Sequence, residues 1–98
     1  MAYESRFKNK ENDELFEAIL ALKDEEECYR FFEDLVTIKE LHAMAQRWQV
    51  AKKLSEGKTY NDIVEETAAS AATISRINKC IAYGADGYNI ILKRLKEK

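Results

Sequence analysis

Hydrophobic residues recur along this chain every three to four positions, which is the period of an α-helix, and no stretch shows the two-residue period of a strand. The pattern predicts six helices in one domain over residues 1–98. We expect two N-terminal helices over residues 1–36 and a long central helix over residues 37–57. A pair of short helices is expected over residues 59–83 and a closing helix over residues 86–98. The predicted fold class is therefore all-α.

The two N-terminal helices are unusually apolar for their length. Residues 11–23 carry a wide hydrophobic face, and a helix start at Asp24, with Glu27 three positions later, precedes a second face rich in aromatic residues. These faces comprise Leu15, Phe16, Ile19, Leu20 and Leu22 in the first helix and Cys28, Tyr29, Phe31, Phe32, Leu35 and Val36 in the second. They exceed what four further short helices can cover, so we predict a subunit interface; a well-filled monomer core is the alternative.

The central helix is predicted to begin at a capping box, in which Thr37 accepts a hydrogen bond from a free backbone amide and Glu40 reaches back to the cap. Gly57 is expected to end it, because glycine favours the residue after a helix. The predicted buried stripe consists of Leu41, Met44, Trp48, Ala51 and Leu54. Trp48 is thus assigned to the core. His42 has no second metal ligand or nucleophile nearby and is assigned to the surface.

The most informative stretch is residues 59–83, which reads as two short helices capped by Thr59 and Ser70. Four isoleucines can close the two helices on each other, namely Ile63 on the first and Ile74, Ile77 and Ile81 on the second. Residues 67–70 between them are small, as a steep crossing over a short turn requires, and Ala68 stands where glycine is common. The pattern is typical of a helix-turn-helix, which places its second helix in the DNA major groove; an ordinary helical hairpin is the alternative.

Charge is distributed unevenly along the chain. The 98 residues carry a net charge of −2, with −6 in residues 1–35 and +4 in residues 36–98, so the candidate motif lies in the basic half. No apolar run is long enough for a membrane span and the start lacks the core of a signal peptide, which predicts a cytoplasmic protein. Cys28 and Cys80 are expected to be small buried residues in a reducing compartment. No catalytic, metal-ligating or cofactor-binding set is recognised, so we expect neither an enzyme nor a cofactor.

The order of the helices and several short segments resemble the Trp repressor family, and within it the YerC/YecD-type proteins most. The resemblance covers residues 35–95 and rests on Thr37, Arg47, the EGKT turn at 56–59, AATISR at 71–76 and YGADGY at 83–88. It implies an all-helical, six-helix, intertwined homodimer. The two recognition helices of such a dimer contact operator half-sites on double-stranded DNA about one helical turn apart.

The resemblance also implies a site for a small effector between the long helix and the recognition helix. By position, this site comprises Thr37, Arg47, Thr73 and Arg76. Arg76 would meet a carboxylate, and the guanidinium groups of Arg47 and Arg76 would flank an aromatic ring. Ile77 and Cys80 stand where Trp repressors have glycine and serine. Because the branched Ile77 side chain would occupy the space that an indole needs, the predicted effector is an amino-acid-like molecule other than L-tryptophan.

The expected DNA-contacting positions are Lys58, Asn61, Ala71, Ala72, Ser75, Arg76 and Lys79, which lie on or beside the open side of the motif. Ala71 and Ala72 can touch thymine methyl groups and Ser75 can accept a hydrogen bond, whereas the charged side chains suit phosphates. Asn61 and Val64 replace basic residues of Trp repressors on the first helix of the motif. A different operator and weaker binding are therefore predicted.

The sequence thus predicts a dimeric, sequence-specific, repressor-like transcriptional regulator that binds DNA and has a site for a small effector. The alternative is a helical dimeric interaction module that keeps the fold without specific DNA binding. The acidic N-terminal half favours this alternative, as do Asp62, Glu65 and Glu66 on the first helix of the motif.

Overall fold

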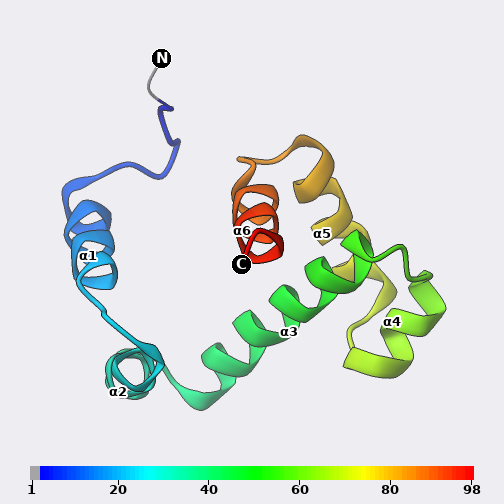
Figure 1. Ribbon diagram of the computed structural model, residues 1–98, viewed down its shortest axis with the longest axis horizontal. Helices are drawn as coiled ribbons and strands as arrows, with labels where there is room; N and C mark the ends of the chain where they lie inside the picture. The colour runs from blue at the N-terminus through cyan, green and yellow to red at the C-terminus, as the bar shows by residue number, and fades with distance from the viewer. Residues whose placement is uncertain (1–2) are drawn as a thin grey trace. The chain divides into compact units, whose positions relative to one another are not determined.

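A computed structural model of the protein describes residues 3–98, which form six α-helices and no strand (Figure 1). The helices are α1 (Lys10–Leu20), α2 (Glu25–Leu35), α3 (Ile38–Ser55), α4 (Tyr60–Thr67), α5 (Ala71–Tyr83) and α6 (Gly87–Lys96). The all-α prediction is confirmed. The chain divides into two compact units, Met1–Thr37 and Ile38–Lys98. Within the described range, none of the helices has both the length and the apolar character of a membrane span.

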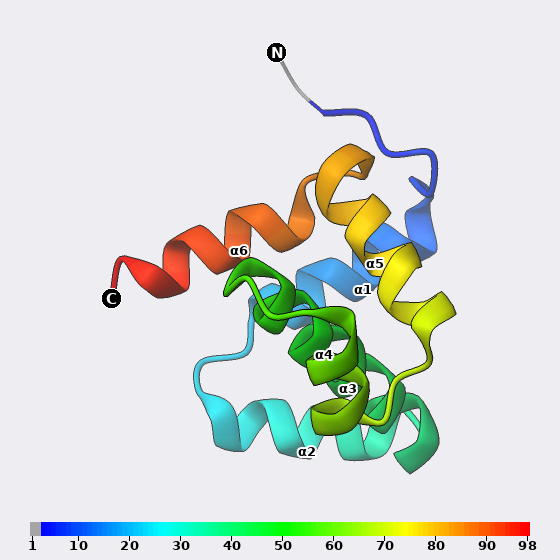
Figure 2. The same ribbon diagram turned by 90° about the vertical axis from the view of Figure 1, so that its right-hand side faces the viewer.

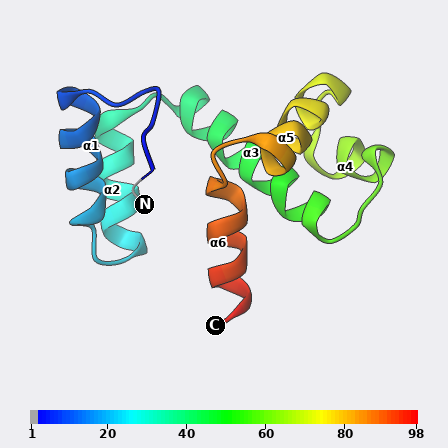
Figure 3. The ribbon, with the colours of Figure 1, turned by 90° about the horizontal axis from the view of Figure 1, so that it is seen from above.

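The first unit contains α1 and α2, which run antiparallel and are joined by residues 21–24 (Figures 2 and 3). The predicted start of α2 is confirmed, since the Asp24 side chain accepts a hydrogen bond from the Glu27 amide at 2.9 Å. Neither helix contains a buried residue. The large apolar side chains left exposed on them are Phe16, Leu20, Tyr29 and Leu35. The apolar faces of these helices are therefore largely uncovered within the first unit.

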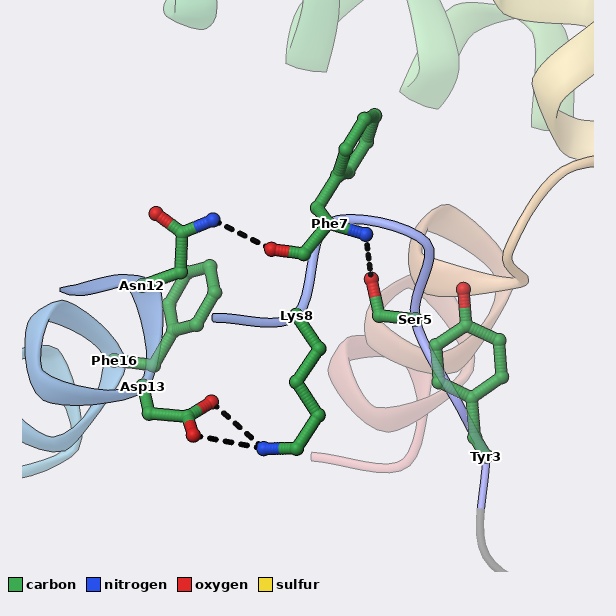
Figure 4. A pocket seen from close by; sticks show the side chains of 7 residues that line it. All are labelled: Tyr3, Ser5, Phe7, Lys8, Asn12, Asp13 and Phe16. Atoms are coloured by element: carbon green, nitrogen blue, oxygen red, sulfur yellow. Dashed lines mark hydrogen bonds and ion pairs between the residues drawn. The ribbon is translucent and has the colours of Figure 1, made fainter. Parts of the chain in front are cut away.

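The segment before α1 folds back over the first turn of that helix (Figure 4). Lys8 Nζ lies 2.7 Å from Asp13 Oδ2, and Asn12 Nδ2 donates a hydrogen bond to the Phe7 carbonyl at 2.7 Å. Between this segment and the helix lies a hollow of about 430 Å³, whose apolar lining is formed by Tyr3, Phe7 and Phe16. This hollow adds exposed aromatic surface to that of α1 and α2.

The second unit is organised around α3, which contacts α4, α5 and α6, while α5 also contacts α4 and α6. Its core contains six buried residues, Val50, Ala51, Ile63, Ala69, Ile74 and Ile77. Four half-buried residues, Trp48, Leu54, Ile81 and Tyr88, pack against this core. The Trp48 and Tyr88 rings are stacked, with centroids 6.3 Å apart and planes inclined by 22°, which joins α3 to α6. The predicted closure of the four isoleucines is confirmed.

The buried surface of α3 differs from the predicted stripe in two positions. Val50 is fully buried although it was not assigned to the stripe, whereas Met44 remains 37% exposed although it was. The physical reason is that α3 is covered by three helices, so its buried surface near Val50 is wider than a single stripe. The surface assignment of His42 is confirmed.

The prediction that the two cysteines are buried is wrong. Cys28 on α2 and Cys80 on α5 are both free thiols and both exposed. The buried core cluster includes Ile74 and Ile77 of α5 but not Cys80, which is exposed.

The predicted end of α3 is confirmed and has a defined geometry. The Lys58 amide donates to the Lys53 carbonyl and the Gly57 amide to the Leu54 carbonyl, both at 3.1 Å. Gly57 has a φ of +82°, the left-handed conformation that glycine adopts without steric cost. This paired arrangement satisfies the last carbonyls of α3 and turns the chain sharply toward α4.

Candidate nucleic-acid interface

Helix α4 and helix α5 begin at side-chain caps that the sequence predicts. Thr59 Oγ1 accepts a hydrogen bond from the Asp62 amide at 3.1 Å, and an Asp62 carboxylate oxygen accepts one from the Thr59 amide at 3.4 Å, which completes a capping box. Ser70 Oγ accepts from the Thr73 amide at 3.1 Å and donates to Thr73 Oγ1 at the same distance. Both helix starts are thereby fixed by residues within three positions.

The turn between α4 and α5 is held by side-chain hydrogen bonds that the sequence analysis did not identify. Thr67 Oγ1 donates to the Ile63 carbonyl at 2.7 Å and accepts from the Ala69 amide at 3.1 Å. Gln46 on α3 donates through Nε2 to the Thr67 carbonyl at 3.1 Å. A threonine near a helix end commonly bonds back to the preceding turn, so the role of Thr67 had a local signal. Gln46 lies 21 positions from Thr67, so no local sequence signal indicated this hydrogen bond.

Ala68 adopts the left-handed conformation, with φ 62° and ψ 11°, and is one of two non-glycine residues with positive φ in the described chain. This backbone geometry explains why glycine is common at this position of a helix-turn-helix. Ala69 follows and is 2% exposed, so the turn both reverses the chain and contributes to the core. The small side chains predicted for this turn are therefore required by burial at Ala69 and by backbone conformation at Ala68.

Helix α5 has one buried flank and one open flank. Ile74 and Ile77 are buried against α3 and α4, whereas the residues on the open flank comprise Ala71, Ala72, Ser75, Arg76, Asn78 and Lys79. All of these are exposed except Ser75, which is half-buried. Within residues 3–98, neither Arg76 nor Lys79 forms an ion pair. The open flank therefore presents small side chains near its start and two unpaired cations further along.

Of the remaining sequence-predicted DNA contacts, Asn61 is exposed on α4, as is the neighbouring Val64. Lys58 is in a different situation, because its Nζ lies 3.1 Å from Glu66 Oε2. Lys53 Nζ lies 2.6 Å from Glu66 Oε1, so one carboxylate holds two lysines. The hydrogen bond and charge of Glu66 raise the pKa of Lys58, and the hydrogen bonds from Lys53 and then Lys58 lower the pKa of Glu66.

Of the four positions assigned to a small effector, Arg47, Thr73 and Arg76 belong to the second unit, and direct contacts do not bring these three together there. Arg47 on α3 and Arg76 on α5 are both exposed, and among the residues of Ile38–Lys98 no hydrogen bond or ion pair connects Arg47, Thr73 and Arg76 with one another. Thr73 instead completes the cap of α5 with Ser70. Thr37 directly precedes α3. Ile77 is 3% exposed, so its branched side chain fills core space between helices.

Comparison with known proteins identifies the origin of this arrangement. The family model described as Trp repressor protein matches residues 10–96, nearly the whole chain. The chain belongs to the Trp repressor family. The sequence-based resemblance is thus confirmed, including its YerC-type character, because the chain is 55% identical over 92 residues to the uncharacterized protein YerC of Bacillus subtilis (strain 168), covering 94% of this chain and 88% of YerC.

Solved structures agree with this family assignment. A TrpR-like protein from Eubacterium eligens superposes with a TM-score of 0.89 at 50% identity, covering 93% of this chain and 94% of that one. A Staphylococcus aureus protein superposes with a TM-score of 0.88 at 45% identity, covering 95% and 93% of the two chains. The six-helix Trp repressor-like fold is therefore established. Proteins of the Trp repressor family are regulators and not enzymes.

Proposed function

We propose that this protein is a sequence-specific DNA-binding transcriptional regulator of the repressor type, acting in the cytoplasm on double-stranded operator DNA. The observation that carries the proposal is the open flank of α5, with small residues at its start and two unpaired cations, Arg76 and Lys79, further along. The buried flank, Ile74 and Ile77, holds α5 rigidly against α3. Such a helix can enter a major groove as a rigid body.

The contacts divide by chemistry. Ala71 and Ala72 lie at the start of α5, where no long side chain keeps the helix away from the base edges; their methyl groups suit thymine methyls, and Ser75 can hydrogen-bond to a base. The side chains of Arg76, Lys79 and Lys58 suit DNA phosphates. The Asn61 amide on α4 can donate a hydrogen bond to the DNA backbone. In this arrangement, phosphate contacts set affinity and the small residues set the preferred sequence.

The exposed faces of α1 and α2 support a homodimer as part of this proposal. Leu20 is 83% exposed, Tyr29 63% and Phe16 57%, and the two helices contain no buried residue. Exposed apolar surface of this extent marks an interaction face, and a second copy carries the same face. Two copies would present two α5 helices to successive half-sites, which doubles the DNA contacts.

A small effector is a further part of the proposal, through Thr37, Arg47, Thr73 and Arg76. The exposed guanidinium groups of Arg47 and Arg76 suit the carboxylate and the ring of an amino-acid-like molecule. The buried Ile77 argues against L-tryptophan itself, because its side chain occupies space beside α5 that an indole would need.

The decisive experiment is selection of sequences from a random duplex pool, followed by a salt titration of binding to the enriched duplex. Arg76→Ala and Lys79→Ala should each weaken binding and reduce the log–log salt slope by about 0.9, the value for one lost phosphate contact. Lys93→Ala on α6 removes the same charge and is the matched control. If neither variant changes affinity more than the control does, α5 is not the recognition helix.

The second candidate function is a helical interaction module that keeps the fold without specific DNA binding. The observation that favours it is the acidic character of residues 1–35, with a net charge of −6, together with the three carboxylates of α4. An interaction module would enrich no sequence from the random pool even at low salt. The same selection therefore separates the two functions.

A further inference from the structure

Three charged residues from separate parts of the second unit meet at one point beside the helix-turn-helix. Lys53 belongs to the last turn of α3, Lys58 to the link before α4, and Glu66 to the last turn of α4. The Glu66 carboxylate is 2.6 Å from Lys53 Nζ and 3.1 Å from Lys58 Nζ, and Lys58 Nζ also reaches its second oxygen at 3.3 Å. One carboxylate thus holds two ammonium groups, and the cluster keeps a net charge of +1.

The position of Glu66 is unfavourable for its own helix. A negative charge in the last turn of a helix is repelled by the partial negative charge of the free carbonyls there. Helix α4 has only eight residues and no basic side chain in its last turn. The carboxylate is held in place by two lysines from outside α4, and these lower the pKa of Glu66 through their hydrogen bonds. The position of this carboxylate is therefore determined by Lys53 and Lys58 and not by the dipole of α4.

The surroundings of the two lysines favour an anion in general. Lys53 and Lys58 keep 21% and 38% of their side-chain surface exposed, so a ligand from solvent can reach them. Thr59, the first residue of the capping box, directly follows Lys58, which places this lysine beside the positive end of the α4 dipole. A phosphate diester carries the same charge as the carboxylate and accepts the same ammonium hydrogen bonds.

We propose that Lys53 and Lys58 form a binding site for a backbone phosphate of duplex DNA, and that Glu66 occupies this site in the free protein as an internal competitor. Glu66 thereby sets the affinity of the protein for DNA without touching a base. This inference rests on the proposed DNA-binding function. It adds Lys53 to the contact surface and gives Glu66 a role in limiting non-specific binding.

The test compares Glu66→Gln with Glu65→Gln on the duplex enriched from the random pool. Glu65 is the matched control because it is adjacent, exposed, in the same helix turn and without an ion pair among the described residues, so its substitution makes the same charge change. Glu66→Gln should raise affinity roughly three- to tenfold at ~0.1 M salt and steepen the log–log salt slope by about one per lysine released. Glu65→Gln should change affinity less than about twofold and leave the slope unchanged.

Two further measurements fix the interpretation. In the Glu66→Gln background, Lys58→Gln should remove most of the gained affinity, because the released ammonium is then absent. Thermal unfolding of each variant establishes that the fold is retained. Lys53→Gln in the Glu66→Gln background should reduce the log–log salt slope by about one, because the second released ammonium is then absent. Equal behaviour of Glu66→Gln and Glu65→Gln, with wild-type protein that binds DNA, would overturn the masking role alone. Failure of wild-type protein and every variant to bind duplex at low salt would instead overturn the proposed function.

Discussion

Gln46 on α3 donates a hydrogen bond through Nε2 to the carbonyl of Thr67 at 3.1 Å and so ties the long helix to the turn between α4 and α5. The Thr67 carbonyl lies at the end of α4, where no intrahelical donor is available to it. The hydrogen bond therefore satisfies a free acceptor and also fixes where α5 begins. A contact of this kind orients the open flank of α5 from outside the motif.

Replacement of Gln46 by alanine should lower the free energy of unfolding by about 1 kcal/mol, the usual value for a lost side-chain hydrogen bond that leaves an acceptor unpaired. Amide exchange at Ala69, in the turn, should become faster. Urea denaturation and hydrogen exchange measure the two effects. Gln49→Ala is the control, since Gln49 lies one turn along α3, is exposed and makes no hydrogen bond among the described residues. Equal losses in both variants would contradict this role of Gln46.

Ala68 offers a stabilising substitution. Its φ of 62° places an L-residue in the left-handed region, which costs about 1–2 kcal/mol and which glycine avoids. After allowance for the greater freedom of glycine in the unfolded chain, Ala68→Gly should raise stability by about 0.5–1 kcal/mol. Ala45→Gly, at an exposed position inside α3, should instead lower stability by about 1 kcal/mol. Ala68→Gly should therefore raise the denaturation midpoint and Ala45→Gly should lower it, with both variants measured at the same protein concentration. A lower midpoint for Ala68→Gly would contradict the cost of the left-handed conformation at Ala68.

Gly84 should not tolerate a side chain. A Cβ atom at this position would lie 2.5 Å from the Cys80 carbonyl oxygen, and the contact is with backbone, which cannot swing away. Gly84→Ala should therefore cost about 1–3 kcal/mol through strain at the end of α5. Gly87→Ala is the control, because nothing lies within 4 Å of its Cβ and its φ is not positive. The measurement is the thermal unfolding temperature of each variant. An equal decrease for Gly84→Ala and Gly87→Ala would refute the steric explanation.

The cluster around Glu66 predicts a defined pH dependence. The pKa of Glu66 is lowered in the folded protein by hydrogen bonds from Lys53 and then Lys58, so its stabilising effect is present above the ordinary carboxyl pKa and is lost as the pH falls through the lowered value. The pKa of Lys58 is raised by the hydrogen bond with Glu66. The contribution of Lys58 to stability is therefore fully present below the ordinary lysine pKa and is lost as the pH rises through the raised value.

The difference in stability between wild-type protein and Glu66→Gln should therefore be constant between about pH 6 and 9 and should shrink below about pH 4. The effect is small because all three side chains are partly exposed, and added salt should reduce it. Urea denaturation at pH 7 and pH 3 measures it. A difference that persisted unchanged at pH 3 would show that Glu66 stabilises the fold by packing and not by charge.

Local features of the fold could be predicted because they depend on residues a few positions apart. The Asp24, Thr59 and Ser70 caps are each closed by an amide three positions later, and the Gly57 stop needs only the preceding turn. The isoleucine face of α5 follows from helical spacing alone. The family resemblance, which rests on the order of the helices and on short segments such as the EGKT turn at 56–59, is confirmed by the comparisons.

The errors and omissions have one cause. Burial of Val50 and exposure of Met44 depend on which three helices cover α3, and the exposure of Cys80 depends on the part of α5 that is left uncovered. The pairing of Glu66 with two lysines joins residues 8 and 13 positions apart. Helical periodicity assigns a residue to a face but does not state what the face meets.

The sequence by itself determined the caps that begin α2, α4 and α5, the glycine that ends α3, which flank of α5 is apolar, and the family to which the chain belongs, because capping and periodicity act over one or two helical turns. Only the tertiary structure decided that Gln46 holds the turn through Thr67 and that Glu66 binds Lys53 and Lys58. These contacts depend on how α3 and α4 pack, which is set by the combined burial of side chains from several helices.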